Sequence, residues 1–242
     1  MIIKADLHTH SAASNDGRSS PADLCRAAAV LGLDAVAICD HDLCTAAQGE
    51  AGVLLISGVE ITTDCGHILG LFLESPVCFE KIEKEDYYRA DSAIDEIQRC
   101  GGLAVLAHPF APQKVSEEVL KSLKVDAIET ANARAALKDG KNAKAAALAA
   151  VRGLPQSGGS DAHCDREVGG AYTELDCEGR TIEEMRAALL AGKSRGVVKA
   201  PCRWIYKGLS RVTRDYRQKG LPGAIRACGY LVGCVVRDVL KF

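Results

Sequence analysis

The sequence predicts a single α/β fold in which short strands alternate with helices around a largely parallel sheet. Three observations support this prediction. Short apolar and β-branched runs alternate with stretches of helical spacing, giving about seven strand–helix units. The 242 residues suffice for one substantial domain with a sizeable core. The composition, 48% hydrophobic and 26% charged, is ordinary for a soluble globular protein.

The elements follow in chain order. A strand at 2–7 precedes a helix that begins after Ser20, with Pro21 at its first position and Asp23 completing a capping box; Gly32 ends it. Helical spacing predicts a second helix near 90–97, an alanine-rich helix at 138–151, and a closing helix capped by Thr181. The remaining predicted strands cover residues 35–39, 53–59, 68–73, 103–107, 125–130 and 154–157.

The C-terminal segment 199–242 differs in charge from the body at 1–198. It contains ten Lys/Arg against two Asp/Glu, a net of +8, whereas 1–198 carries a net of -10. We expect a barrel domain over 1–198 and a short basic helical extension over 199–242, broken at 220–223. The extension is interpreted as an interaction surface. The options are a packing or oligomerisation helix, a nucleic-acid contact, or a membrane-surface helix with the apolar residues Ile225, Leu231, Val232, Val235, Val236 and Leu240.

Cysteine usage and hydropathy indicate a cytoplasmic protein. The eleven cysteines are odd in number and form no CxxC pair, which favours reduced thiols. Met1 leads directly into a strand-like run containing Asp6, so a signal peptide is not expected. The uncharged run at 227–236 is about half the length that a bilayer requires, so no transmembrane segment is expected. The oligomeric state stays open.

The histidines carry the functional prediction. Five lie at or after the ends of predicted strands, His8, His10, His41, His108 and His163, and His67 enters the run that follows the third strand. Acidic residues occur at comparable points: Asp6, Asp16, Asp40, Asp42, Glu60 and Asp161. In a βα barrel the carboxyl ends of the strands face one mouth, so these side chains converge. Imidazole and carboxylate ligands suit Zn, Mn or Fe, and a carboxylate can bridge two ions. The sequence therefore predicts a metal centre.

Five motifs add a resemblance. They are Asp6-Leu7-His8-Thr9-His10-Ser11, Cys39-Asp40-His41-Asp42, Gly58-Val59-Glu60-Ile61, Ala107-His108-Pro109 and Gly159-Ser160-Asp161-Ala162-His163. In type and order they resemble the motifs of the polymerase and histidinol phosphatase (PHP) family over roughly 1–198. The resemblance implies a distorted (β/α)7, TIM-like barrel with two or three divalent ions. It also implies hydrolysis of phosphate esters by a metal-activated hydroxide.

The resemblance also assigns ligands. It places His8, His10, Glu60 and Asp161 around one ion, with Glu60 bridging to the next. It gives the second ion to His108, assisted by Asn132, and the third to Asp16, His41 and His163. Asp16 and Asn132 stand where some members have histidine, and an amide oxygen is a weak ligand. Asp6 and Asp42 are expected to orient histidines.

The remaining roles concern catalysis and substrate. His67 and Asp161 are the catalytic candidates, with His67 near the substrate as a general acid. Arg18, Arg134 and Arg166 are candidates for phosphate binding, because each lies close in sequence to a predicted ligand. We expect a small phosphorylated substrate. The alternatives are a nuclease or nucleotide phosphodiesterase acting on nucleic acid ends, and a non-catalytic metal-binding module. A cysteine nucleophile among Cys39, Cys44, Cys65 and Cys164 is the weaker catalytic reading.

Overall fold

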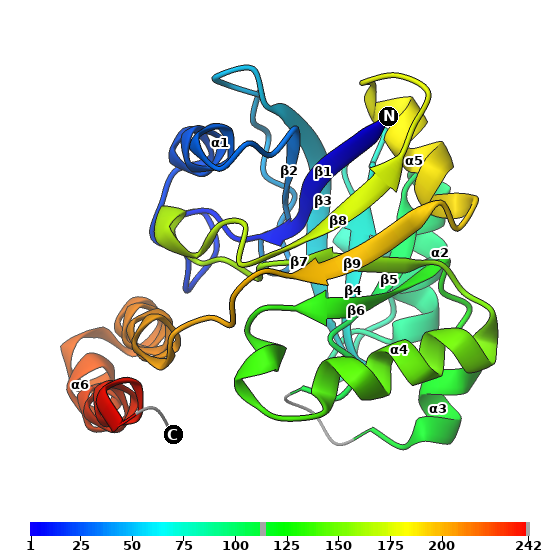
Figure 1. The fold of residues 1–242 in the computed structure, drawn as a ribbon. Coiled ribbons are helices and arrows are strands. Elements are labelled where there is room, and N and C mark those ends of the chain that lie inside the picture. The colour runs from blue at the N-terminus through cyan, green and yellow to red at the C-terminus, as the bar shows by residue number, and fades with distance from the viewer. Residues whose placement is uncertain (112–114, 241–242) are drawn as a thin grey trace.

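The computed structural model describes residues 1–111 and 115–240. Within them, nine strands form one sheet in the order β7-β6-β5-β4-β3-β2-β1-β8-β9, curled into a nearly closed barrel (Figure 1). The strands are β1 (Ile2–Thr9), β2 (Ala35–Ile38), β3 (Leu54–Thr63), β4 (Gly66–Leu71), β5 (Leu103–Ala107), β6 (Ala127–Asn132), β7 (Gln156–Gly159), β8 (Ala171–Asp176) and β9 (Ser194–Val198). The predicted distorted barrel is confirmed.

Six α-helices and three short 3-10 helices lie in the same described ranges. They are α1 (Pro21–Val30), η1 (Phe79–Lys81), α2 (Ala90–Arg99), α3 (Glu117–Ser122), η2 (Ala135–Leu137), α4 (Lys141–Arg152), η3 (Asp165–Glu167), α5 (Ile182–Leu190) and α6 (Trp204–Leu240). The Ser20–Asp23 capping box of α1 is present as predicted, with Pro21 at the start of the helix.

The sheet departs from a regular parallel barrel in two places. β4 runs antiparallel between β3 and β5, because the tight turn at Gly66, whose φ is 104°, joins β3 to β4 as a hairpin. β8 is antiparallel to both β1 and β9. The sequence prediction missed β8 and β9. The side chains of β8 alternate between buried and partly exposed positions, so the strand lacks the continuous apolar run that marked the others.

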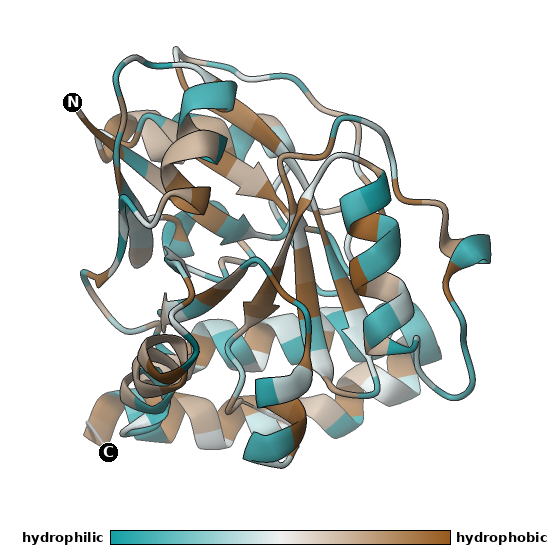
Figure 2. Cartoon of the chain, turned by 90° about the vertical axis from the view of Figure 1, so that its right-hand side faces the viewer, coloured by the Kyte–Doolittle hydropathy of each residue, from teal (hydrophilic) through white to brown (hydrophobic). Residues whose placement is uncertain are grey.

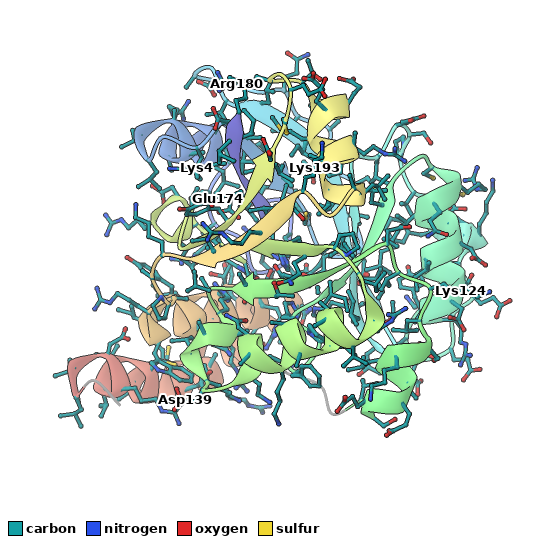
Figure 3. The ribbon with its side chains drawn as sticks, turned by 45° about the vertical axis from the view of Figure 1, so that its right-hand side comes forward. Lys4, Lys124, Asp139, Glu174, Arg180 and Lys193 are labelled. Atoms are coloured by element: carbon teal, nitrogen blue, oxygen red, sulfur yellow. The ribbon has the colours of Figure 1, made fainter. Side chains whose placement is uncertain are left out.

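Apolar packing fixes the barrel on both sides of the sheet. Leu7, Ile56, Leu69 and Val105 meet inside it, together with Met185 of α5. α5 packs near the amino end of β1, which leaves the opposite end of the barrel for polar groups (Figure 1). A second cluster, formed with α2 and α4, covers the outside of β4, β5 and β6. The charged residues labelled in Figure 3, such as Lys124 and Arg180, lie on the outside of the molecule.

The barrel closes where β7 meets β1. Asp161 N donates to His8 O at 2.8 Å, and His10 N donates to Ala162 O at 2.7 Å. Gly159 permits this approach, because a Cβ there would lie 2.4 Å from the Cβ of His8. The seam between β7 and β1 therefore brings four motif residues side by side.

The basic extension forms α6, which consists of two helices joined at a break. Gly220 has φ 65° and ψ -160°, so the predicted break at 220–223 is confirmed. Asp238 caps the first helix by accepting from Trp204 N at 2.9 Å and Ile205 N at 2.8 Å. Figure 1 shows α6 on the side of the barrel toward which the arrowheads of β1 and β6 point.

Apolar residues of the second helix of α6 face outward. Ile225, Val232, Val236 and Leu240 are exposed, whereas Leu231 packs close to Gly208 of the first helix. Figure 2 shows brown, apolar segments along this part of the chain. In the described residues, no helix combines the length and apolar character needed to cross a bilayer.

Candidate metal centre

All six histidines converge at the carboxyl end of the barrel. His8 and His10 lie at the end of β1, and the ring centroids of His10 and His163 are 4.2 Å apart. The His8 and His108 centroids lie 5.6 Å apart, and those of His41 and His67 are separated by 5.4 Å. Residues spread from position 8 to position 163 therefore form one continuous cluster, as the strand-end pattern predicts.

Glu60 of β3 lies at the centre of this cluster and is 1% exposed. Its Oε2 is 3.2 Å from His10 Nε2 and 3.2 Å from His41 Nδ1. Its Oε1 lies 2.7 Å from His67 Nδ1 and 3.1 Å from His108 Nε2. The two carboxylate oxygens thus face different histidines, an arrangement suited to a bridging ligand.

Two aspartates complete the cluster around His163. Asp16 Oδ2 lies 3.1 Å from His163 Nε2 and 3.7 Å from His41 Nε2. Asp161 Oδ1 lies 3.4 Å from His10 Nε2 and 3.6 Å from His163 Nδ1. Asp161 has a φ of 56° and His108 a φ of 27°, conformations that non-glycine residues rarely adopt. Such strain is frequent at functional sites.

Hydrogen bonds orient three of the imidazole rings. His8 Nδ1 bonds to Glu129 Oε1 at 2.9 Å, His108 Nδ1 to Ala111 O at 2.6 Å, and His163 Nδ1 to the Asp161 carbonyl oxygen at 2.9 Å. In the neutral form of such a ring, an oxygen partner at Nδ1 fixes the tautomer and leaves the lone pair of Nε2 directed into the cluster. In the part of the chain that the structure describes, the buried Nδ1 atom of His10 has no hydrogen-bond partner.

The carboxylates stay ionised despite their burial. Desolvation opposes ionisation of Glu60, but the surrounding imidazoles hold its pKa well below the usual range. Asp16 and Asp161 are shifted in the same direction for the same reason. Burial lowers the pKa of His41 to about 3, which keeps this imidazole neutral and able to act as a ligand. The cluster therefore combines anionic oxygen donors with nitrogen donors.

This donor set fits divalent metal ions. Among residues 1–111 and 115–240, four groups have ligand atoms from different residues that all lie within 4.8 Å of one another. The groups are His10–Asp16–His41–His163, His8–Glu60–His108, His8–His10–Asp161 and His41–Glu60–His67. Mixed imidazole and carboxylate donors suit Zn, Mn and Fe. His67, expected near the substrate, lies inside the cluster beside Glu60.

Asn132 and the two accessory aspartates contact the backbone or other polar groups. The oxygen of Asn132 accepts from Ala135 N at 2.7 Å, and its amide nitrogen donates to Glu129 at 3.0 Å. Asp6 accepts from Ser160 N and Gly169 N, both at 2.8 Å, and thereby fixes the loop that carries Asp161. Asp42 accepts from Thr62 N and makes no hydrogen bond to a histidine ring in the described residues.

Glu129 of β6 is a site residue that the sequence reasoning did not single out. It is buried and accepts from three groups: His8 Nδ1, the backbone nitrogen of His108, and Asn132 Nδ2, at 2.9 to 3.0 Å. The signal was an acidic residue in an otherwise uncharged strand. Buried carboxylates need partners, so this position could have been identified.

The three predicted phosphate-binding arginines lie in different places. Arg134 lines the cavity above the cluster, but its Nη2 donates to Glu167 at 2.8 Å. Arg18 is not among the residues that line this cavity, and its Nη2 lies 3.9 Å from the same carboxylate. Arg166 lines two other surface cavities and not this one. In η3 the Glu167 side chain turns inward, which leaves its neighbour Arg166 directed to solvent.

The cavity also receives residues from α6. Lys207 and Arg214 line it together with Lys138, which follows η2. The sequence reasoning treated the extension separately from the site and did not single these residues out. Burial raises the pKa of Cys39, Cys44, Cys65 and Cys164, which disfavours the thiolate that a cysteine nucleophile needs.

Comparison with known proteins agrees with this geometry. The model of the PHP domain matches residues 6–125, and the model of a PHP-associated region matches residues 139–194. An uncharacterized protein of Methanocaldococcus jannaschii (MJ1587) is 32% identical over 148 residues, and the match covers 54% of this chain and 82% of the length of that protein. A 5'-3' exoribonuclease of Haemophilus influenzae is 34% identical over 116 residues, and the match spans 42% of either chain.

Solved structures share the fold. A two-domain protein from Bacteroides vulgatus, described as containing a predicted PHP-like metal-dependent phosphoesterase, aligns with a TM-score of 0.63 at 22% identity. The alignment covers 82% of this chain and 65% of that one. At this identity the likeness bears on the fold, and the chain spans less than two thirds of the Bacteroides protein.

Proposed function

This chain belongs to the PHP domain family, and from that premise we propose that it is a metal-dependent phosphoesterase acting at the histidine cluster. The proposal rests on one observation. Glu60 is buried among His8, His10, His41, His67 and His108, and both of its oxygens face imidazole nitrogens. A buried carboxylate inside a ring of nitrogen donors favours a polynuclear cation site.

The proposed ligands fall into three sets. His8, His10, Glu60 and Asp161 would hold one ion. His108 would hold a second with the help of Glu60. Asp16, His41 and His163 would hold a third. Divalent Mn, Zn or Fe bound there would lower the pKa of a water molecule and neutralise the oxygens of a phosphoryl group. Because Asn132 donates a hydrogen bond to Glu129, we assign Asn132 a role in positioning Glu129 and not in binding a metal ion directly.

Other residues would serve the substrate. His67 lines the cavity and lies 2.7 Å from Glu60, so we assign it the role of proton donor to the leaving group. Asp161 would accept hydrogen bonds from the attacking water, beside its ligand role. Arg134, held by Glu167, would present its guanidinium edge to a phosphate oxygen. Residues 1–198 would form the catalytic domain and 199–242 an extension beside its mouth.

The experiment is metal removal and restoration. Protein stripped by a chelator should lose hydrolysis of p-nitrophenyl phosphate and regain it with Mn²⁺, Zn²⁺ or Fe²⁺, while elemental analysis records the bound ions. His10→Ala should reduce both the metal content and the activity, because His10 contacts Glu60 and Asp161. Full activity of metal-free protein would refute the proposal.

A nuclease is the second candidate, and one observation favours testing it. The relative from Haemophilus influenzae, a 5'-3' exoribonuclease, is 34% identical over 116 residues. Short RNA and DNA oligonucleotides therefore belong in the substrate panel beside small phosphate monoesters. Preferential release of nucleotides from RNA ends would select the nuclease over a small-molecule phosphatase.

A further inference from the structure

One face of α6 is directed at the mouth of the barrel. Lys207, Ser210, Arg214 and Arg217 recur at spacings of three and four residues, which places them on one side of the helix. Lys207 and Arg214 line the cavity above the metal-ligand cluster. Ser210 Oγ accepts from Arg134 Nη2 at 2.9 Å. The helix therefore forms part of the cavity wall.

Backbone contacts hold this helix in place on both sides of the cavity. Arg217 Nη1 donates to the carbonyl oxygen of Ala12 at 3.1 Å and to that of Ser14, in the loop that carries Asp16. Before the helix begins, Cys202 N donates to Ala133 O at 2.9 Å, next to Arg134. The position of α6 is thus tied to the two loops that flank the cavity.

The cations at the cavity rim differ in their partners. Arg134 is neutralised by Glu167, and Arg214 Nε lies 3.3 Å from Asp215. Neither Lys138 nor Lys207 forms an ion pair anywhere in residues 1–111 and 115–240. Burial lowers the pKa of the half-buried Lys207, and the Asp161 carboxylate opposes that shift. The partly desolvated ammonium group of Lys207 gains from an anionic ligand, and the exposed Lys138 lines the same cavity.

The carboxylates on the floor of the cavity do not serve as counter-charges for the cations at its rim. Glu60, Asp16 and Asp161 face imidazole nitrogens, and under the proposed function they would be neutralised by divalent ions. Cations next to a loaded metal centre repel it unless an anion lies between them. One phosphoryl group carries about two negative charges, which the ions on the floor would already neutralise, whereas the rim adds the three cations Lys138, Lys207 and Arg214.

We propose that Lys138, Lys207 and Arg214 form an anion subsite, here called the rim subsite, which binds a second phosphate group of the substrate. The substrate class is thus a phosphate ester with at least one further phosphate, supplied either by a small bisphosphorylated metabolite or by the next nucleotide of a strand. This inference rests on the proposed function for the position of the cleaved ester.

The test compares matched substrates and ligands. Metal-loaded wild type, Lys207→Gln and Arg214→Gln are assayed with a sugar monophosphate and its bisphosphate, and with a mononucleotide and its dinucleotide. Calorimetry with inorganic phosphate and pyrophosphate measures binding without turnover. Arg226→Gln is the control, because Arg226 is an exposed cation of α6 that does not line the cavity. Melting curves establish that every variant is folded.

The rim subsite predicts that the wild type prefers the member with two phosphates. For the substrate with two phosphates, kcat/KM of each variant should fall about tenfold, mostly through a higher KM. For the matched substrate with one phosphate, the fall in kcat/KM should be several-fold smaller. The same variants should lose the preference for pyrophosphate over phosphate. Equal losses for both members, or none, would overturn the subsite. Tight pyrophosphate binding without hydrolysis of any substrate would refute the proposed function and leave the subsite standing.

Discussion

Replacing Glu129 by Gln tests whether the cluster depends on a carboxylate outside the ligand set. Glu129 accepts three hydrogen bonds of 2.9 to 3.0 Å, from His8 Nδ1, His108 N and Asn132 Nδ2. Glutamine keeps one acceptor oxygen and turns an NH₂ group toward the remaining donors. Each bond to a charged group contributes about 1.5–3 kcal/mol, and its loss lets the His8 ring rotate. We expect metal affinity to fall by roughly 10–100-fold, equivalent to about 1.4–2.7 kcal/mol.

The assay is competition with a metal-binding dye at fixed pH, combined with kcat/KM for p-nitrophenyl phosphate. Glu174→Gln is the matched control, because Glu174 pairs with Arg195 on the outside of the barrel (Figure 3). The control should bind metal like the wild type. A folded Glu129→Gln protein whose Kd for metal stays within about twofold of the wild type would refute the positioning role.

Two further predictions concern stability. Gly159→Ala should cost about 1–3 kcal/mol or more, seen as a lower melting temperature, because its Cβ would lie 2.4 Å from that of His8. Gly229→Ala should instead be neutral or stabilising, because no described atom outside its own helix backbone and chain neighbours lies within 4 Å of the added Cβ; equal effects would contradict the steric argument. Hydrogen bonds from Arg99 lower the pKa of Glu96 from its ordinary 4.5 to about 2, so this pair stabilises the fold above pH 4.5 and loses its contribution as the pH falls toward 2. Urea unfolding of the wild type and Glu96→Gln should therefore differ above pH 4.5 and converge toward pH 2, and a difference independent of pH would exclude this mechanism.

Much of the fold was predictable because strong local signals mark it. The strand at 103–107 was predicted with its observed bounds, and the start of α1 followed from Ser20, Pro21 and Asp23. β8 and β9 escaped prediction because their stability comes from pairing with β1 and with each other. Residue periodicity carries little information about such tertiary pairing. The antiparallel direction of β4 depends on the turn at Gly66, which the sequence marked only as a break.

The candidate site was predictable where one residue type recurs at strand ends. The convergence of five histidines follows from the common direction of the strands that they end, whereas His67 reaches the mouth because β4 runs antiparallel. The roles of Arg166, Lys207 and Arg214 were not predictable from sequence proximity, because side-chain direction decides them. Arg166 is adjacent to Glu167 but points to solvent, whereas Lys207 lies 44 positions beyond His163 and still reaches the cavity. Proximity in sequence to a metal-ligand candidate therefore does not predict which residues line the cavity when a distant helix such as α6 packs at the mouth of the barrel.

The seam between β7 and β1 has a consequence for how the protein is held together. The sheet order ends at β7, and the barrel is completed near the site by the pairing of Thr9 with Ala162. The candidate ligands lie on both sides of this junction, with His8 and His10 on one side and Asp161 and His163 on the other. A bound ion would cross-link the two sides of this junction, so metal loading and resistance to unfolding should rise together.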